Sequence, residues 1–276
     1  MVFIKKMTDA MTENLRTAVT DLLRGIKCLD LAATLGWQDV KQRYRRSALG
    51  PFWLTISMAV LIGTLAMVFG GVFNAKMDEF LPFLAIGFVL WAYISTVINE
   101  GCTAFSNSDA IIKQLPLPMT LHVFRVVWRN QIIMAHNAVI VPLVFLAFLK
   151  LPGLIVFEAV LGLLLNTLIL AWIALLLGII CTRYRDLPQI VNSLLQIAFY
   201  TTPIVWMPNL LAGTKRGFLL IQMNPLFHMI EVIRAPLLGH SPSMLSWLVV
   251  VNIAFWGWLL TLLFFGKYRN RISYWL

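Results

Sequence analysis

The stretch AVLGLLLNTLILAWIALLLGIICT, residues 159–182, contains no Asp, Glu, Lys or Arg. An α-helix rises 1.5 Å per residue, so about 20 apolar residues cross the roughly 30 Å of hydrocarbon in a bilayer. Lipid offers no hydrogen-bond partners to backbone N–H and C=O groups, whereas a helix pairs these groups within itself. The stretch therefore predicts a membrane-spanning helix.

Further uncharged runs lie on both sides of it, at residues 47–75, 80–99, 130–149, 187–214 and 235–266. The chain of 276 residues is 60% hydrophobic and only 12% charged, with a mean hydropathy of +0.82. Soluble domains carry about 25% charged residues. The runs also lack the period-two alternation of outer-membrane barrel strands. We therefore predict an all-α polytopic membrane protein with six transmembrane helices.

The expected organisation is a cytoplasmic N-terminal region, residues 1–46, followed by a six-span transmembrane domain, residues 47–276. The predicted spans lie near residues 52–74, 81–102, 130–149, 155–182, 188–206 and 244–266. Lys and Arg concentrate in cytoplasmic connections. Of the 22 Lys and Arg residues, 17 fall in the N-terminal region, the second and fourth connections and the C-terminal tail. Both termini are therefore predicted to be cytoplasmic, and the net charge of +10 does not require a nucleic-acid partner.

The N-terminal region carries apolar residues at spacings of three and four, from Leu15 to Tyr44. This pattern predicts an amphipathic helix, which we expect to break near Gly36. Two interpretations are equally open. The helix lies in the headgroup layer against membrane lipids, or part of it also docks a cytoplasmic partner.

The sequence RYRRSALGPFW, residues 43–53, leads from this region into the first span. Arg43, Arg45 and Arg46 stand next to an apolar helix that opens with a proline and two aromatic residues. One interpretation is that they only anchor the helix as positive-inside residues. The other is that they also bind an anionic headgroup such as pyrophosphate, because the arginine side chain binds such groups in a bidentate manner.

The cytoplasmic connection NSDAIIKQLPLP, residues 107–118, predicts a short projecting helix. Ser108 or Asp109 can cap its start, and Pro116 and Pro118 end it. Such a helix is a suitable contact for a partner protein, although a plain turn is the alternative. A second connection, RYRDLP at residues 183–188, is too short to be a domain.

The outer half of the chain contains two segments unlike ordinary spans. In FYTTPIVWMP, residues 199–208, Pro203 breaks the helical hydrogen-bond ladder, which indicates a cavity lining, a hinge or simply a helix end. Residues 217–230 are uncharged but too few to span, so we expect re-entrant or interfacial outer helices before the last span. In NPLFHMIEVIRAPLLG, residues 224–239, Glu231 and Arg234 are three apart on one helix face and are expected to pair.

Motifs for nucleotide binding or catalysis are absent. The sequence has no GxxxxGK[ST], HExxH or GxSxG. Its four histidines and three cysteines lack metal-ligand spacing, so no catalytic residue, metal or cofactor is predicted in this chain. Energy for any active transport must therefore come from another protein.

Taken in order, these motifs resemble the membrane subunit of ABC-2-type exporters, in the branch that exports O-antigen, lipopolysaccharide, capsule or teichoic acid chains. The resemblance covers about residue 30 to the C-terminus. It implies a homodimer in the bacterial inner membrane that binds two copies of a separate ABC ATPase, which holds the ATP and Mg. The cargo it implies is a lipid-linked polysaccharide.

The resemblance also assigns roles to particular residues. The coupling residues that contact the ATPase would be Trp37, Asp39, Ser108, Asp109 and Lys113. Spans one and five would line the substrate channel with Phe69, Phe73, Phe199, Tyr200 and Trp206. The outer helices would form a gate that includes Pro225, Glu231 and Arg234.

The resulting hypothesis is that an undecaprenyl-pyrophosphate-linked glycan enters near Arg43, Arg45 and Arg46 and passes outward between two copies of the chain. ATP-driven motion of the partner would change the contact between the copies. The alternatives are an integral membrane enzyme of lipid-carrier glycan assembly, a passive channel, and an exporter of another lipid-linked or small amphipathic substrate.

Overall fold

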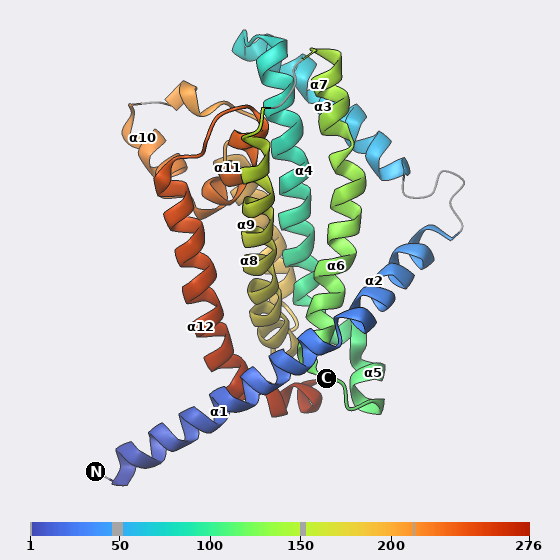
Figure 1. Cartoon of the computed structure of the whole chain (residues 1–276), viewed down its shortest axis with the longest axis vertical. Coiled ribbons are helices and arrows are strands. Elements are labelled where there is room, and N and C mark those ends of the chain that lie inside the picture. Colours follow the sequence, from blue (N-terminus) through green and yellow to red (C-terminus); the bar gives the residue numbers. More distant parts are fainter. Residues whose placement is uncertain (1, 46–51, 150–152, 212) are drawn as a thin grey trace.

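The computed structural model describes residues 2–45, 52–149, 153–211 and 213–276. Within these ranges the chain is helical and contains no β-strand, which confirms the all-α prediction. Upright helices form a bundle, and α1 and α2 lie across one end of it (Figure 1). We call the end with α1, α2 and α5 the inner end. The opposite end, with the α3–α4 turn, is called the outer end.

The N-terminal region forms α1 (Val2–Lys27) and α2 (Leu29–Tyr44). The bundle and its connections comprise α3 (Phe52–Phe73), α4 (Met77–Cys102), a 3-10 turn (Ser106–Ser108), α5 (Asp109–Gln114), α6 (Met119–Ala138), α7 (Ile140–Ala147), α8 (Val156–Arg183) and α9 (Leu187–Thr201). A 3-10 turn (Pro208–Leu211), α10 (Lys215–Gly217), a π-helical turn (Phe218–Gln222), α11 (Pro225–Leu237) and α12 (Met244–Trp275) follow.

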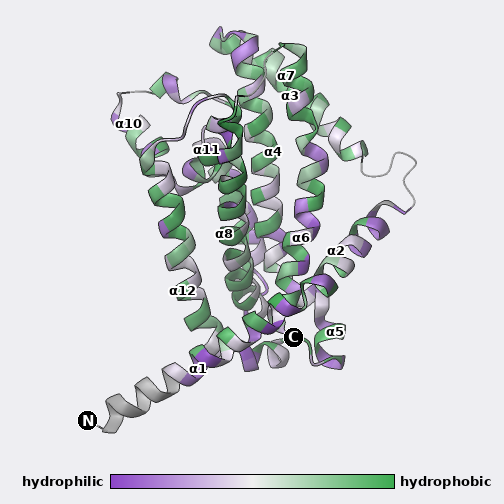
Figure 2. Ribbon diagram, in the orientation of Figure 1, coloured by the Kyte–Doolittle hydropathy of each residue, from purple (hydrophilic) through white to green (hydrophobic). Residues whose placement is uncertain are grey.

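Five helices of the described chain are long and apolar enough to cross a membrane: α3, α4, α6 with α7, α8 and α12. The third begins at Met119, well before the predicted residue 130. Arg125 and Arg129 end the uncharged run there but not the helix, because both are paired with carboxylates. Likewise α12 continues beyond the predicted residue 266 to Trp275. Hydropathy is high along α4 and α8 and mixed along α2 and α6 (Figure 2).

The predicted fifth span, residues 188–206, is helical only over the 15 residues of α9. That length corresponds to about 22 Å, which is less than the hydrocarbon thickness. After Thr201 the chain continues as non-helical backbone to the 3-10 turn Pro208–Leu211, where Asn209 lines a cavity with Glu79. Six spanning helices therefore remain a prediction.

The predicted break near Gly36 is wrong, since the helix of the N-terminal region is interrupted at Cys28 and Gly36 lies inside α2. Gly36 instead allows close helix packing. A Cβ atom at this position would lie 3.1 Å from the backbone oxygen of Arg125 on α6. The glycine is therefore explained by the approach of α2 to α6.

One buried carboxylate joins three helices at the inner end. Asp21 of α1 accepts hydrogen bonds from the backbone N–H groups of Met119 (3.3 Å) and Thr120 (3.1 Å) at the start of α6. Its Oδ2 also accepts from Nε of Arg269 on α12, at 2.6 Å. Pro118 at the N-cap has no capping side chain, so Asp21 caps α6 from another helix.

The centre of the bundle is the contact between α4 and α8. A Cβ atom at Gly101 would lie 2.7 Å from Cα of Ala174, so the two backbones touch there. In its most apolar window, α4 has 72% of its residues buried, whereas α3 has 17%. In Figure 1, α3 leans away from the upright helices. The single chain thus has a packed centre and a sparsely covered first span.

We predict that Asp21→Ala lowers the free energy of unfolding by about 1–3 kcal/mol, because it leaves two N–H groups and a guanidinium without their acceptor. Thermal unfolding of the detergent-purified protein measures this loss. Asp30→Ala is the matched control, since Asp30 is exposed on the next helix. Equal effects of the two substitutions would contradict the capping role.

Candidate functional site

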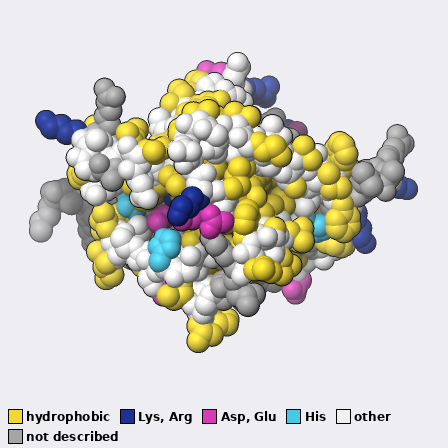
Figure 3. Space-filling view, turned by 90° about the horizontal axis from the view of Figure 1, so that it is seen from above, with side chains coloured by type: hydrophobic (Ala, Val, Ile, Leu, Met, Phe, Trp, Pro, Cys, Tyr) yellow, Lys and Arg dark blue, Asp and Glu magenta, His cyan; other side chains and the backbone are white. Residues whose placement is uncertain are grey.

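Two polar sites lie at opposite ends of the bundle. At the inner end, charged side chains of α2, α4 and α6 meet. At the outer end, α11 meets the non-helical segment that follows α9. Seen from the outer end, acidic, basic and histidine side chains gather beside one another among hydrophobic side chains (Figure 3).

The inner charge cluster consists of Asp39, Arg43, Glu100, Arg125 and Arg129. Nε and Nη2 of Arg125 bind both carboxylate oxygens of Asp39, and Nη1 of Arg129 binds Asp39 at 2.9 Å. Nη2 of Arg129 also donates to Glu100 at 2.6 Å, and Arg43 binds Glu100 at 2.9 Å. Because the bonds run from α2 to α6 to α4, the cluster attaches the N-terminal region to two bundle helices.

Three guanidinium groups and two carboxylates give this cluster one net positive charge. Burial alone would raise the pKa of Asp39, but its hydrogen bonds and charge attraction with Arg125 and Arg129 outweigh burial and lower that pKa below its usual value. Asp39 is therefore ionised at neutral pH. Its stabilising contribution is lost only as the pH falls through this lowered pKa, below about 4.

The predicted coupling residues lie in two separate places. On α2, Trp37 is 47% exposed and stacks with the Lys41 ammonium group at 5.7 Å, whereas the Asp39 side chain is only 14% exposed and occupied inside the protein. The structure thus gives Asp39 a fold-stabilising contact that the sequence did not suggest.

Of the other coupling residues, Asp109 and Lys113 are on the short helix α5 and Ser108 directly precedes it. The helix begins at Asp109 and ends before Pro116, as predicted. Asp109 and Lys113 form an exposed i,i+4 ion pair of 2.8 Å. Ser108 is buried and its side chain forms no capping bond. The projecting surface is therefore made by Asp109 and Lys113.

The three arginines predicted to bind a headgroup are not shown as one group. Arg43 binds Glu100 within the inner charge cluster, and Arg45 is exposed just after α2. Arg46 lies outside the described residues. A headgroup role for the three stays a prediction.

The predicted channel aromatics form two groups on different helices. On α3, Phe69 and Phe73 stack with ring centroids 5.7 Å apart. On α9, Phe199 packs against α4 and Tyr200 is 76% exposed. Trp206 lies after α9, and its Nε1 donates to the Tyr200 backbone oxygen at 3.2 Å. No ring contact joins the two groups within the described part of one chain.

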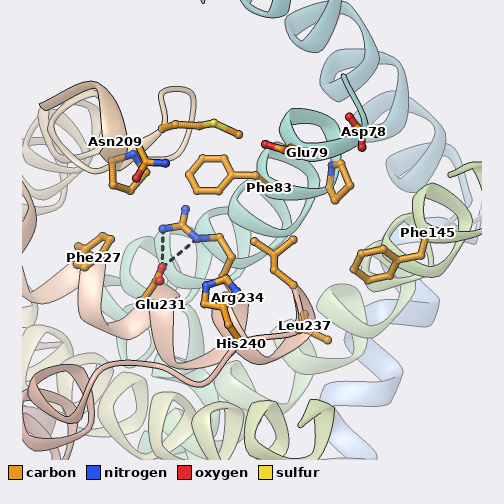
Figure 4. Close-up of a pocket in the computed structure, with 15 residues that line it drawn as sticks. Asp78, Glu79, Phe83, Phe145, Asn209, Phe227, Glu231, Arg234, Leu237 and His240 are labelled. Carbon is orange, nitrogen blue, oxygen red and sulfur yellow. Dashed lines mark hydrogen bonds and ion pairs between the residues drawn. The ribbon is translucent and has the colours of Figure 1, made fainter. Parts of the chain in front are cut away.

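At the outer site, Arg234 of α11 is 1% exposed although it carries a guanidinium group. Its Nε and Nη2 donate to Glu231, at 3.1 and 2.7 Å, which confirms the predicted pairing (Figure 4). Its Nη1 donates to the backbone oxygen of Pro203 at 2.7 Å, and the guanidinium lies 4.0 Å from the Phe83 ring. Solvation of Arg234 at the outer surface, one interpretation of the sequence, is therefore wrong.

The start of α11 is fixed by the residue before Pro225, as the sequence predicted. Asn224 accepts from the N–H groups of Leu226 (3.0 Å) and Phe227 (3.4 Å), and its amide donates to the Thr202 hydroxyl at 3.0 Å. Together with the Arg234 bond to Pro203, this contact attaches α11 to the break after α9 at two points.

Sequence reasoning missed Asp21 and Glu100 as organising residues, and it missed Phe83 as the partner of Arg234. Each acts on a residue that is distant in sequence. For Asp21 and Glu100 the available signal was the carboxylate itself, because a buried acid needs a partner. For Phe83 the sequence held no such signal.

These features are those of a helical membrane protein. Its described residues contain no group of three or more side chains that could bind a metal ion. Its class is a membrane-embedded transport subunit. The chain belongs to the ABC-2 type transporter family, whose model matches residues 31–238.

Curated relatives cover most of the chain. An O-antigen export system permease protein RfbA of Myxococcus xanthus is 24% identical over 213 residues, which are 76% of this chain and 81% of the relative. A protein of the same name from Klebsiella pneumoniae is 22% identical over 218 residues, 73% of this chain and 77% of the relative.

We predict that Arg234→Lys leaves the protein folded but less stable by about 1–3 kcal/mol, because one ammonium group cannot reproduce the paired bonds to Glu231 together with the bond to Pro203. Thermal unfolding measures the loss, and hydrogen exchange locates it in residues 199–210. Arg271→Lys, at an exposed position of α12, is the control. Unchanged exchange at the break would refute the predicted link.

Proposed function

We propose that the chain is the permease subunit of an ABC exporter that moves a lipid-linked polysaccharide, most specifically O-antigen, across the bacterial inner membrane. The observation that carries this proposal is the family membership, combined with relatives named as O-antigen export permeases over three quarters of the chain. The sequence itself has no P-loop, so the proposal places ATP and Mg on a separate ATPase subunit.

The proposed functional unit contains two copies of the chain and two ATPase subunits. Helix α3 has few neighbours in the single chain, and α9 leaves Ile190, Leu194, Ile197 and Tyr200 exposed on one side. Two copies that face each other through α3 and α9 would enclose a pathway lined by the aromatic groups of both helices. Aromatic faces suit sugar chains because they contact C–H surfaces without strong polar binding.

Coupling to the ATPase is proposed at the inner end, through α5 and the exposed part of α2. The inner charge cluster supports this proposal, because it attaches α2 directly to α4 and α6 by charged hydrogen bonds. Displacement of α2 by a partner would therefore displace two bundle helices. Arg43, Arg45 and Arg46, at and after the end of α2, are proposed to receive the pyrophosphate of the lipid carrier.

The proposal predicts that a clean deletion of the gene abolishes surface polysaccharide, while lipid-linked glycan accumulates inside the cell. Gel electrophoresis of surface glycan and extraction of the carrier lipid measure both quantities. Normal surface glycan in a strain without a second exporter would refute the proposed cargo. Accumulation of a different lipid would instead indicate another amphipathic substrate.

For the coupling surface, we predict that the double exchange Asp109→Lys with Lys113→Asp impairs export at least several-fold. The exchange keeps an i,i+4 ion pair on α5 but reverses its charges toward a partner. Co-purification of the ATPase and surface glycan levels are the measurements. Asp186→Asn, at an exposed inner-end position outside α5, is the control, and full export by the exchanged variant would contradict docking at these residues.

A further inference from the structure

Two of the three cysteines lie together at the inner end of the bundle. Cys102 is the last residue of α4, and Cys181 lies in the last turn of α8. Both side chains are buried, and the two thiols are hydrogen-bonded to each other. Neither belongs to the inner charge cluster or to the outer site. The third cysteine, Cys28, lies at the junction of α1 and α2.

The pair lies beside a close approach of α4 and α8. A Cβ atom at Gly101 would lie 2.7 Å from Cα of Ala174, and one at Gly178 would lie 3.2 Å from the Gly101 backbone oxygen. Each cysteine is within three residues of one of these glycines on its own helix. A disulfide needs Cα atoms closer than about 7 Å. Because the glycines bring the two backbones together beside the cysteines, the helix packing suits a disulfide.

A cavity at the inner end gives small molecules access to the pair. Cys102 and Cys181 both line it, and its volume is about 360 Å³. Ser106 and Arg185 on its wall are exposed, so the cavity opens at the inner surface. A water molecule takes up about 30 Å³ in the liquid, so the cavity has room for a small polar molecule such as hydrogen peroxide. A reagent dissolved in water can therefore reach the two sulfur atoms.

The charges on the cavity wall favour the reactive form of a cysteine. The thiolate, not the thiol, is the nucleophile, and a neighbouring guanidinium stabilises it. Arg185 supplies this positive charge. Asp109, the acid among the lining residues, is ion-paired with Lys113 at 2.8 Å, so its negative charge is balanced. The wall therefore carries a net positive charge toward the two sulfur atoms.

The inner end is predicted to be cytoplasmic, where cellular reductants keep thiols reduced and disulfides are usually transient and redox-sensing. The dithiol is therefore the resting form of the pair. We propose that Cys102 and Cys181 are a peroxide-sensitive redox site, whose disulfide holds the inner ends of α4 and α8 together. The oxidant is a peroxide, and the reductant that reverses the reaction is a small thiol.

The oxidation takes place in two steps. One thiolate attacks an oxygen atom of hydrogen peroxide and breaks the O–O bond, which leaves a sulfenic acid on that cysteine and releases hydroxide. The proton that this thiol lost converts the hydroxide to water. The second thiol then attacks the sulfenic sulfur, so that the S–S bond forms, the S–O bond breaks and hydroxide leaves as water with the second thiol's proton. The thiols are oxidised to a disulfide, and the peroxide is reduced to water.

A disulfide at this place would fix two inner connections relative to each other. Cys102 leads through a 3-10 turn into α5, and Cys181 leads through a short turn into α9. Under the proposed coupling role of α5, a fixed connection would hinder the motion that drives export. This effect on export rests on the proposed function, whereas formation of the disulfide does not.

Disulfide formation is tested on the purified protein in detergent, which is treated with hydrogen peroxide and then denatured. A maleimide-polyethylene glycol reagent counts the free thiols, and peptide mass spectrometry maps any link. The wild type is expected to lose two of its three thiols to a link between Cys102 and Cys181, and dithiothreitol is expected to restore both. Cys28→Ser, the matched control, is expected to form the same link. Cys102→Ser and Cys181→Ser are expected to form no intrachain disulfide.

The attachment of α4 to α8 is tested by thermal unfolding. Because the link closes a long loop, the oxidised wild type and the oxidised Cys28→Ser variant are expected to unfold at least about 4 °C above their reduced forms. Peroxide is expected to cause no such rise in Cys102→Ser. The mapped link and the unfolding temperature of the wild type decide the proposal even if a serine variant fails to fold.

The effect on export is tested in cells by a brief peroxide treatment. The surface glycan that appears after the treatment is expected to fall at least twofold in the wild type and to stay level in a Cys102→Ser strain. An equal response of the two strains would overturn the effect on export. Normal surface glycan in the deletion strain would instead refute the proposed cargo.

Several results would overturn the redox site itself. They are no loss of thiols, a link through Cys28, irreversible oxidation to sulfinic acid without a link, and an unchanged unfolding temperature of the linked protein. The thiol and unfolding measurements do not use export, so their failure is distinguishable from failure of the proposed function.

Discussion

The fold depends on one constraint: backbone polar groups within a membrane need hydrogen-bond partners inside the protein. The hydrogen bond from Arg234 to the Pro203 backbone oxygen provides such a partner where the helix is broken. Helix α9 ends at Thr201, and residues 202–207 are not helical before the 3-10 turn Pro208–Leu211. A buried guanidinium therefore supplies a donor to the broken segment, Glu231 balances its charge, and Asn224 adds a second attachment through Thr202. The short outer helix α11 is thus attached to the segment that follows α9, within and just beyond the predicted fifth span.

The same requirement explains why the sequence predicted so much of the fold. Uncharged runs identified the five helices of the described chain that are long and apolar enough to span, because charged side chains are costly in hydrocarbon and the backbone must be helical there. Helix ends were less predictable. Arg125 and Arg129 appear to end a span only when their partners are unknown, and those partners, Asp39 and Glu100, lie 86 and 29 residues away.

In the two sites, contacts between residues close in sequence were predictable, and contacts between distant residues were not. Glu231 with Arg234, and Asn224 before Pro225, were predictable because helix geometry places residues two to four apart beside each other. The contact of Asp21 with the start of α6 was not, because it joins residues 98 positions apart. The roles of Phe69, Phe199 and the other proposed channel residues remain predictions, since a channel between two copies is not determined by the contacts within one.

The two polar sites differ in the kind of backbone that they hold together. At the inner end, Arg129 binds Asp39 and Glu100 at once, so α2 and α4 are held to the same side chain of α6. At the outer end, Arg234 holds α11 to non-helical backbone, which has fewer hydrogen bonds to maintain its shape. Helix α4 takes part in both sites, because Glu100 lies in the inner charge cluster and the Phe83 ring lies against the Arg234 guanidinium at the outer end. The contacts of both polar sites therefore meet on one helix.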